Sequence, residues 1–191
     1  MANNLEVEVK LPLPASVANI RRKLSALGFR VVKSRSLEQN TVFDTESLTL
    51  RVKGQLLRLR RYGSDRVLTY KGPPTPGKHK SREELEISGA DPGKLSLILM
   101  RLGYRPVFLY EKYRTEFAPP KGRGMVTLDE TPIGNYLEIE GRAGFIDRTA
   151  KALGFTEADY NTKSYGALYL EFCKRRGIEP GDMVFRRNAK A

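Results

Sequence analysis

The chain has 191 residues, 40% of them hydrophobic and 29% charged, which suits one globular domain whose core needs no disulfide or structural metal. One cysteine, Cys173, and one histidine, His79, exclude a disulfide framework and a zinc site built from cysteine or histidine clusters. The sequence has no apolar stretch long enough for a signal core or a membrane span, so we expect a cytoplasmic protein without membrane contact. Lys and Arg outnumber Asp and Glu by 34 to 22, and the net charge of +12 indicates a polyanionic partner.

Alternating apolar and charged side chains mark the first predicted strand, residues 5–11. Its polar face carries Glu6, Glu8 and Lys10, and its other face carries only Leu and Val. The same alternation recurs in six later segments, which are residues 57–60, 68–71, 84–87, 112–117, 126–129 and 137–140. A strand with one face in water usually mixes uncharged polar side chains with scattered charges, whereas these segments carry paired charges of one sign or alternate charges with apolar residues. If the charged faces converge inside a closed antiparallel barrel, the carboxylates would hold divalent cations and the basic side chains would hold phosphates.

Apolar residues at helical spacing predict four helices, over residues 16–27, 94–102, 145–153 and 163–176. The first three end in a leucine, a glycine and an aromatic residue, so strand, helix and this tripeptide form a loose repeat. Glycine is favoured just past the end of a helix, and Ser16 is the expected N-cap of the first one. Helices lying on the outside of the barrel would explain why the outward strand positions are apolar.

Proline and glycine predict two loops, over residues 72–81 and 119–124. The composition of the first loop favours an exposed histidine at His79. Cys173, next to Phe172 on the last helix, is expected to be a structural thiol, because no histidine stands near it in the sequence. Nothing marks a boundary within residues 1–185, which we expect to form one domain, and the basic tail 186–191 is expected to fray.

Taken in chain order, the charged motifs resemble those of the CYTH family, the triphosphate tunnel metalloenzymes. That family includes class IV adenylyl cyclases, thiamine triphosphatases and inorganic triphosphatases. Glu6-x-Glu8-x-Lys10 is similar to the family's opening ExExK signature, and the later motifs are Arg58-x-Arg60, Thr69-Tyr70-Lys71-Gly72, Glu84-x-Glu86, Lys112-x-Arg114, Leu128-Asp129, Glu138-x-Glu140 and Lys163-Ser164-Tyr165. The resemblance covers residues 5–172 and implies an α+β fold: a closed eight-stranded antiparallel β-barrel that forms a tunnel with a charged lumen, and helices packed on its outside.

The resemblance also implies that a triphosphate binds in the tunnel together with Mg²⁺ or Mn²⁺. Hard dications prefer carboxylate oxygens and bridge phosphates, and the candidate metal ligands are Glu6, Glu8, Asp129, Glu138 and Glu140. The candidate phosphate ligands are Lys10, Arg58, Arg60, Lys71, Lys112 and Arg114. Glu84 and Glu86 would either hold metal or orient the basic side chains. Lys163 is the candidate catalytic residue, although the start of a helix is an unfavourable place for a cation.

The leading function is divalent-metal-dependent hydrolysis of an inorganic, thiamine or nucleoside triphosphate. The alternative is a class IV adenylyl cyclase, in which the ribose 3′-hydroxyl attacks the α-phosphorus of ATP and pyrophosphate leaves. Both reactions use the same tunnel, so the motifs do not separate them. A third reading, a non-catalytic binder of polyphosphate or RNA 5′ ends, rests on charge alone and leaves the acidic pairs unexplained. The expected partner is a small molecule that contains a triphosphate; nucleic acid is not expected as a partner, and a homodimer is left open.

Overall fold

The computed structural model describes residues 5–13, 16–89 and 91–186. Its strands are β1 (Leu5–Pro12), β2 (Arg30–Asp44), β3 (Leu56–Tyr62), β4 (Asp65–Lys71), β5 (Lys80–Ser88), β6 (Arg105–Ala118), β7 (Met125–Thr131) and β8 (Gly134–Glu140). Its α-helices are α1 (Val17–Ala26), α2 (Thr49–Val52), α3 (Pro92–Arg101), α4 (Ala143–Leu153) and α5 (Tyr165–Arg176), and a 3₁₀ turn covers Glu157–Asp159. None of the helices in these residues is long and apolar enough to cross a membrane.

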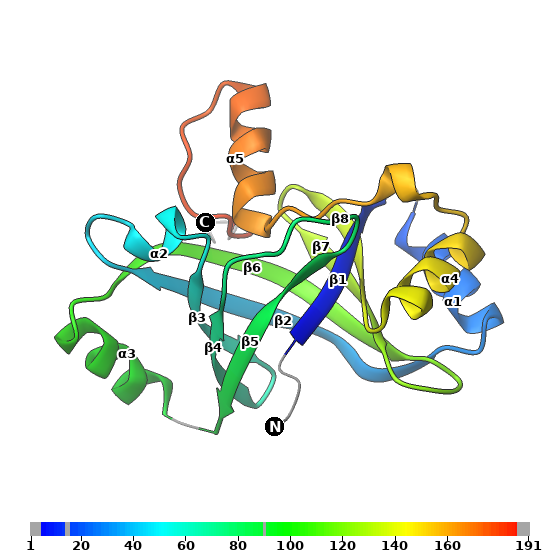
Figure 1. The fold of residues 1–191 in the computed structure, drawn as a ribbon, viewed down its shortest axis with the longest axis horizontal. Coiled ribbons are helices and arrows are strands. Elements are labelled where there is room, and N and C mark those ends of the chain that lie inside the picture. Colours follow the sequence, from blue (N-terminus) through cyan, green and yellow to red (C-terminus); the bar gives the residue numbers. More distant parts are fainter. Residues whose placement is uncertain (1–4, 14–15, 90, 187–191) are drawn as a thin grey trace, which may run out of the picture.

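The strands form a closed barrel in the order β1-β5-β4-β3-β2-β6-β7-β8, with antiparallel pairing between all neighbours (Figure 1). The predicted eight-stranded antiparallel barrel is therefore confirmed. Because side chains alternate along each strand, closure points every second residue into the lumen. In this ring β8 lies opposite β3, so the two strands face each other across the tunnel.

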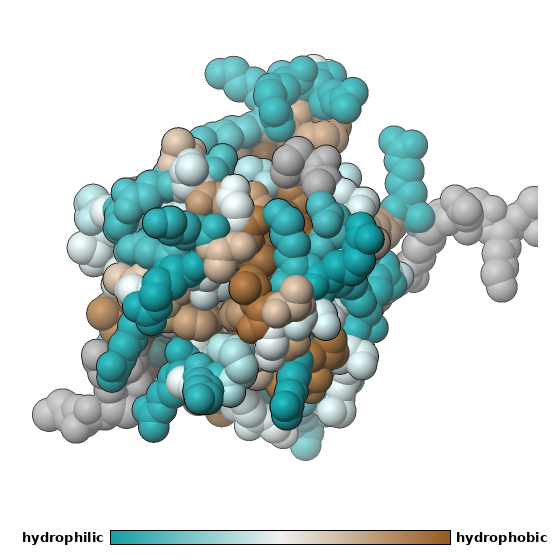
Figure 2. Space-filling model, turned by 90° about the vertical axis from the view of Figure 1, so that its right-hand side faces the viewer, coloured by the Kyte–Doolittle hydropathy of each residue, from teal (hydrophilic) through white to brown (hydrophobic). Residues whose placement is uncertain are grey.

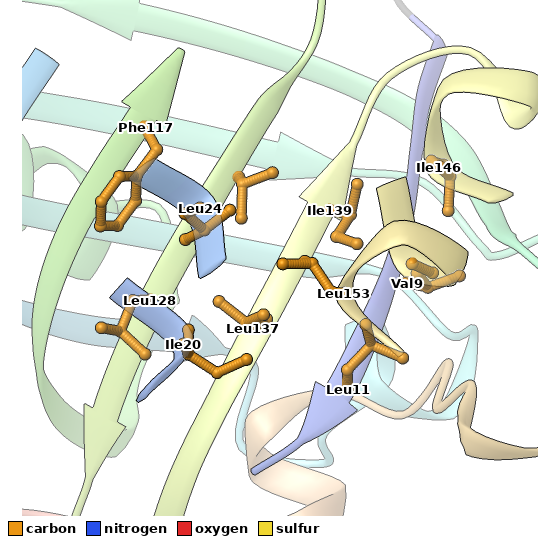
Figure 3. Close-up of a cluster of buried hydrophobic side chains, with 12 residues drawn as sticks. Val9, Leu11, Ile20, Leu24, Phe117, Leu128, Leu137, Ile139, Ile146 and Leu153 are labelled. Atoms are coloured by element: carbon orange, nitrogen blue, oxygen red, sulfur yellow. The ribbon is translucent and has the colours of Figure 1, made fainter. Parts of the chain in front are cut away.

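The outward side chains of β1, β6, β7 and β8 form the main core with α1 and α4 (Figure 3). Strand side chains at this contact are fully buried, as in Val9, Leu137 and Ile139, and they meet Leu24 of α1 and Leu153 of α4. A smaller cluster packs α3 against β2 and β3. The prediction that helices cover the apolar outside of the barrel is confirmed. Because the apolar faces of the strands are buried under the helices, the charged faces point into the lumen.

The glycines predicted to end three helices do so. Gly28, Gly103 and Gly154 have φ angles of +81°, +88° and +93°, a left-handed conformation that glycine adopts without steric cost. Ser16 precedes α1 in an extended conformation, but its side chain makes no capping hydrogen bond. The last helix begins at Tyr165 with Ser164 as its N-cap, so Lys163 lies just before the helix and not within it.

Strand β2 is absent from the sequence prediction, although it has 15 residues. It contains Glu38 and Asn40, and its pairing with β6 is interrupted by register shifts, which break the simple alternation that marks the other strands. Strand β5 begins at Lys80, so the predicted loop 72–81 is too long by two residues. Lys80 pairs with Glu8 of β1, and this contact draws the end of the loop into the sheet.

The prediction of an exposed His79 is wrong, because its side chain is only 10% exposed. The β4–β5 loop packs against α4, where His79 Nε2 lies 2.7 Å from Asp147 Oδ1 and the ring packs on Tyr160. Loop composition could not reveal this contact, because the partners lie in a distant part of the chain. Cys173 is fully buried, in agreement with a structural thiol. Apart from Arg186, the tail predicted to fray lies outside the described residues.

Candidate functional site

The barrel encloses a cavity of about 840 Å³ that opens beside α2 and α5. Of the fourteen residues predicted for the site, thirteen line this cavity: Glu6, Glu8, Lys10, Arg58, Arg60, Lys71, Glu84, Glu86, Lys112, Arg114, Glu138, Glu140 and Lys163. The fourteenth, Asp129, is bonded directly to the lining side chains Lys112 and Arg114. The alternating charges of separate strands thus converge in one chamber.

One part of the chamber is a dense set of ion pairs and hydrogen bonds, which we call the Asp129 network: Lys10, Glu38, Lys112, Arg114, Asp129, Glu138 and Tyr165. Asp129 is fully buried. Its carboxylate accepts hydrogen bonds from Lys112 Nζ at 2.9 Å and from Arg114 Nε and Nη2 at 2.7 and 2.6 Å. The Tyr165 hydroxyl on α5 donates a further bond of 2.6 Å. Both oxygens of Asp129 are therefore occupied, and this carboxylate fixes cations and anchors α5.

Glu138 continues the network on the neighbouring strand. Its Oε1 lies 2.8 Å from Lys10 Nζ, and its Oε2 accepts a bond from Arg114. Burial opposes ionisation of Glu138, but the charges of Lys10, Lys112 and Arg114 hold its pKa well below the usual range. Burial would lower the pKa of Lys10, yet Glu138 and Glu8 raise it above its ordinary value. In this region each buried charge faces opposite charges at close range.

Glu38 belongs to the same network, and the sequence prediction misses it. It is fully buried on β2, and its Oε1 lies 3.4 Å from Lys112 Nζ. Although burial opposes it, the cations Lys112 and Arg114 lower the pKa of Glu38 to about 2. The alternation of Ser36, Glu38 and Asn40 is a usable signal for a strand, but it is too weak to stand out beside the other segments.

Across the tunnel, β3 presents two arginines with spare hydrogen-bonding capacity. Arg58 donates to the Tyr110 hydroxyl at 3.2 Å and to Thr69 Oγ1 at 3.3 Å. Arg60 donates to Glu86 Oε1 at 3.5 Å. The Nε atoms of both arginines are buried and lack a hydrogen-bond partner among the described residues. Buried donors are normally satisfied, so these two mark a place where an acceptor is missing.

The wall formed by β1, β4 and β5 carries its own ion pairs. Lys71 Nζ lies 2.6 Å from Glu6 and 3.1 Å from Glu84. Lys80 Nζ bonds Glu8 at 2.8 Å, and burial together with the nearby Lys10 charge lowers the pKa of Lys80 to about 8. The sequence prediction misses Lys80 and Arg82 as lumen residues, because it begins this strand only at residue 84. The regular spacing of residues 80, 82, 84 and 86 is the signal that could have found them.

Two carboxyl groups in the chamber, Glu84 and Glu140, have raised pKa values. Partial burial in the tunnel, followed by repulsion from the Glu6 and Glu8 carboxylates, raises the pKa of Glu140 to about 7. Burial and repulsion from Glu6 raise the pKa of Glu84 to about 7 as well, although Lys71 opposes this. Glu140 forms no ion pair with any residue in the described ranges. We call the incompletely paired side chains Arg58, Arg60, Glu84, Glu86 and Glu140 the open wall.

The carboxylates of this region fit a divalent cation. As placed in the described part of the chain, no three Asp, Glu, His or Cys side chains already converge as a metal site. Nevertheless Glu8 and Glu140 are direct partners on adjacent strands, and Glu6 and Glu84 repel Glu140. A dication would relieve this repulsion and favour the ionised forms. Glu6, Glu8, Glu84 and Glu140 are therefore the side chains best placed to hold one.

The structure separates the six predicted phosphate ligands into two groups. Lys10, Lys71, Lys112 and Arg114 are engaged by carboxylates of the wall. Arg58 and Arg60 keep free donors, which makes them the best placed of the six to receive a phosphate oxygen.

Lys163, the predicted catalytic residue, lines the mouth of the cavity. Its side chain is 51% exposed, and Nζ pairs with Glu171 on α5. Because Lys163 precedes the N-cap Ser164, it stands close to the positive end of the helix dipole. Its proposed role stays a prediction.

A closed eight-stranded barrel whose lumen holds paired acidic and basic side chains defines the class of protein, a barrel with a charged tunnel. The CYTH domain pattern matches residues 4–165, so the chain belongs to the CYTH domain family. The resemblance drawn from the charged motifs is thereby confirmed.

Individual relatives agree with this assignment. A protein of Methanocaldococcus jannaschii, provisionally named an adenylate cyclase, is 27% identical over 149 residues, which cover 78% of this chain and 83% of the relative. A solved structure from Vibrio parahaemolyticus with the same provisional name has a TM-score of 0.76 at 20% identity and covers 90% of this chain and 98% of its own. A Hippeastrum structure has a TM-score of 0.60 at 20% identity, over 92% of this chain and 97% of its own. The two solved structures support the fold.

Proposed function

We propose that the tunnel binds a triphosphate together with Mg²⁺ or Mn²⁺ and hydrolyses it. The observation that carries the proposal is the open wall, where two arginines with buried, unpartnered Nε atoms share a chamber with carboxyl groups whose pKa is raised to about 7. The two Nε atoms lack an acceptor, and among the described residues Glu140 lacks a cation. A metal–triphosphate complex supplies both at once.

When bound, the metal would neutralise phosphate charge and activate the phosphorus towards water. Arg58 and Arg60 would donate to phosphate oxygens and hold the chain of phosphates against β3. In hydrolysis the oxygen of water forms a bond to the terminal phosphorus, the bridging P–O bond breaks, and the diphosphate portion leaves with the bonding electrons. The Asp129 network keeps Lys112 and Arg114 in fixed positions, so they need no rearrangement as charge develops.

Lys163 is our candidate for moving the proton of the attacking water. It lies at the cavity mouth next to α5, which Tyr165 anchors to Asp129. An anchored helix holds the lysine near the chamber, and a lysine amine can serve as a general acid or base when it is positioned.

Adenylyl cyclisation is the second candidate, and the apolar lining of the mouth favours it. Apolar side chains line the cavity near α2 and α5, among them Leu48, Val107 and Phe108, and these could receive a nucleobase. The M. jannaschii relative carries the provisional name of a cyclase. The Hippeastrum protein, also considered an adenylyl cyclase, has a dominant triphosphatase activity.

Product analysis tests the proposal. The purified protein would be incubated with tripolyphosphate, thiamine triphosphate or ATP, each with Mg²⁺, with Mn²⁺ or with excess chelator. We expect phosphate and a diphosphate product that form only when metal is present. Cyclic AMP and pyrophosphate from ATP would favour the cyclase instead. Full turnover in excess chelator would contradict the metal-dependent mechanism.

A further inference from the structure

The tunnel does not account for the positive charge of the protein. Its wall holds ten basic side chains: Lys10, Arg51, Arg58, Arg60, Lys71, Lys80, Arg82, Lys112, Arg114 and Lys163. With the buried Glu38 and Asp129 it also holds ten acidic ones: Glu6, Glu8, Glu38, Asp44, Glu84, Glu86, Glu116, Asp129, Glu138 and Glu140. The remaining 24 of the 34 Lys and Arg residues and 12 of the 22 Asp and Glu residues lie elsewhere in the chain. The excess of +12 therefore comes from residues that do not line the tunnel, and a ligand inside the tunnel does not explain it.

Much of the excess is concentrated in three segments: residues 16–30 around α1, residues 118–124 between β6 and β7, and residues 141–154 around α4. Together these segments contain nine basic residues and one acidic residue, Asp147. We call the nine the basic face: Arg21, Arg22, Lys23, Arg30, Lys121, Arg123, Arg142, Arg148 and Lys151. Asp147 does not neutralise them, since it is engaged by Lys78 and His79 of the β4–β5 loop.

Contacts between the three segments make this one surface. Helix α1 packs against α4, and Lys23 Nζ donates to the Leu153 carbonyl at 2.8 Å. The end of α1 lies against the β6–β7 loop, where Gly28 meets Pro120, and Arg30 pairs with Ala118 in the sheet. The rings of Phe29 and Phe145 pack at 6.4 Å between their centroids. Figure 1 shows α1 and α4 side by side at the right of the barrel, and Figure 2, which views that side, shows long hydrophilic side chains over much of it.

The charges of the basic face are not neutralised within the described part of the fold, although Lys23 donates to the Leu153 carbonyl and Arg21 to Thr115. None of the nine forms an ion pair with a carboxylate of the described residues. All except the half-buried Arg21 are exposed. Like charges crowded on one surface repel one another and lower stability. A surface of this kind gains most from a partner that is itself a dense array of negative charges.

We infer that the basic face binds the sugar–phosphate backbone of a nucleic acid. Six of its nine cations are arginines, which bind phosphate in a bidentate manner. They are spread over two helices and a loop, so they match an extended polyanion better than a single triphosphate. The aromatic residues of these segments, Phe29 and Phe145, pack on each other and are not free to stack on bases. Binding should therefore depend little on sequence.

An anionic membrane fits the same face less well. Surface helices that bind membranes insert an apolar face between the lipids. The apolar face of α1 is not available for this, because Ile20 and Leu24 are buried against the barrel. The same is true of Ile146 and Leu153 on α4. Only the charged sides of the two helices remain available.

Fluorescence anisotropy with labelled RNA and DNA duplexes of unrelated sequences tests the inference on the full chain. We expect binding that weakens steeply as salt rises, with affinities that agree across sequences within a few fold. Reversing two charges of the face, in Arg22→Glu/Lys151→Glu, should weaken binding by roughly 10-fold or more and reduce the slope of log affinity against log salt by about two. The loop variant Lys121→Glu/Arg123→Glu should do the same without altering either helix.

Lys53→Glu/Arg101→Glu is the matched control, because it makes the same charge change at exposed positions on α3 and next to α2. We expect it to lower affinity less than about 3-fold. Equal losses in all three variants would mean that net charge alone acts, and would overturn the inference. So would tighter binding to vesicles of anionic lipid than to duplexes, or displacement of the duplex by tripolyphosphate at concentrations that fill only the tunnel. None of these outcomes depends on triphosphatase activity, so this experiment tests nucleic-acid binding independently of the proposed function.

Discussion

The Asp129 network and the open wall lie in the same chamber but differ in how completely their charges are paired. Asp129 accepts hydrogen bonds from three side chains and is fully buried, whereas Glu140 forms no ion pair in the described residues and has its pKa raised to about 7. In the network the buried charges are paired with one another, although Glu38 Oε2 accepts no hydrogen bond among the described residues. In the open wall the Nε atoms of Arg58 and Arg60 lack an acceptor and Glu140 lacks a cation. This difference underlies the proposed function: the network fixes the shape of the chamber, and the open wall would bind the proposed triphosphate and its metal.

The largest effect should come from breaking the network. Asp129→Asn removes the charge that faces Lys112 and Arg114 and leaves those buried cations poorly compensated. Removing one partner of a buried ion pair usually costs about 3–5 kcal/mol of stability, and urea unfolding would measure it. Tyr165→Phe, which deletes one hydrogen bond to the same carboxylate, is the milder control at about 1 kcal/mol. An Asp129→Asn protein as stable as the parent would mean that the network is not structural.

The variant Lys163→Ala tests whether Lys163, which lies just before α5, takes part in the reaction. We expect turnover to fall by roughly 10²-fold, the effect of losing a positioned general acid or base. Stability should change little, because the Lys163 side chain is half exposed. Steady-state kinetics with tripolyphosphate and metal measures the effect, and Arg176→Ala at the far end of α5 should leave the kinetics alone. If both variants behave like the parent, Lys163 has no catalytic role.

Arg60→Ala probes the anion-binding side of the open wall. Each charge-assisted contact is worth roughly 1.5–3 kcal/mol, so triphosphate affinity should fall by about 10- to 100-fold. Arg61→Ala is a matched control, since Arg61 is the next residue on β3 and points outward into solvent. Calorimetric titration with tripolyphosphate and metal would compare the two variants. Equal losses would place the anion outside the tunnel.

Glu140→Gln should have the smallest effect and the opposite sign. An acid whose pKa is raised on folding takes up a proton when the chain folds, so the free energy of unfolding falls as pH rises from about 4.5 to 7. Above pH 7 the variant should be more stable than the parent by up to about 1 kcal/mol, a figure kept small because solvent screens this side chain. Below pH 5 the gain should vanish, because Glu140 is then protonated on its own.

Thermal denaturation at pH 5 and pH 8 measures the Glu140→Gln effect. Glu138→Gln is the internal control, since Glu138 is held ionised by Lys10 and Arg114 and its loss should destabilise the protein at both pH values. A divalent cation should stabilise the parent more than Glu140→Gln. If Glu140→Gln and Glu138→Gln change stability in the same way at both pH values, the two carboxylates do not differ in how they are paired.

Strands with strict alternation were predictable, as were the helices that end at glycine. In residues 5–11, 57–60 and 137–140 the period of two is unbroken, so the local pattern places Glu6, Arg58 and Glu140 each on the charged face of its strand. Prediction failed where local pattern and tertiary contact disagree. The register shifts of β2 hid Glu38, and the proline-rich loop concealed the start of β5 with Lys80 and Arg82.

Which side chains share a strand face follows from the amino-acid order, because alternation is a local property of the extended backbone. The ordered charged motifs, through their resemblance to a known family, were enough for the barrel class and the family, and all but one of the predicted site residues line the chamber. The pairing of the charges, in contrast, follows only from the closed fold. Asp129 and Glu140 look alike in the sequence, yet one lies among three donors and the other among carboxylates. Pairing depends on which strands become neighbours around the barrel and on where α5 docks, and those distances are set only when the chain closes.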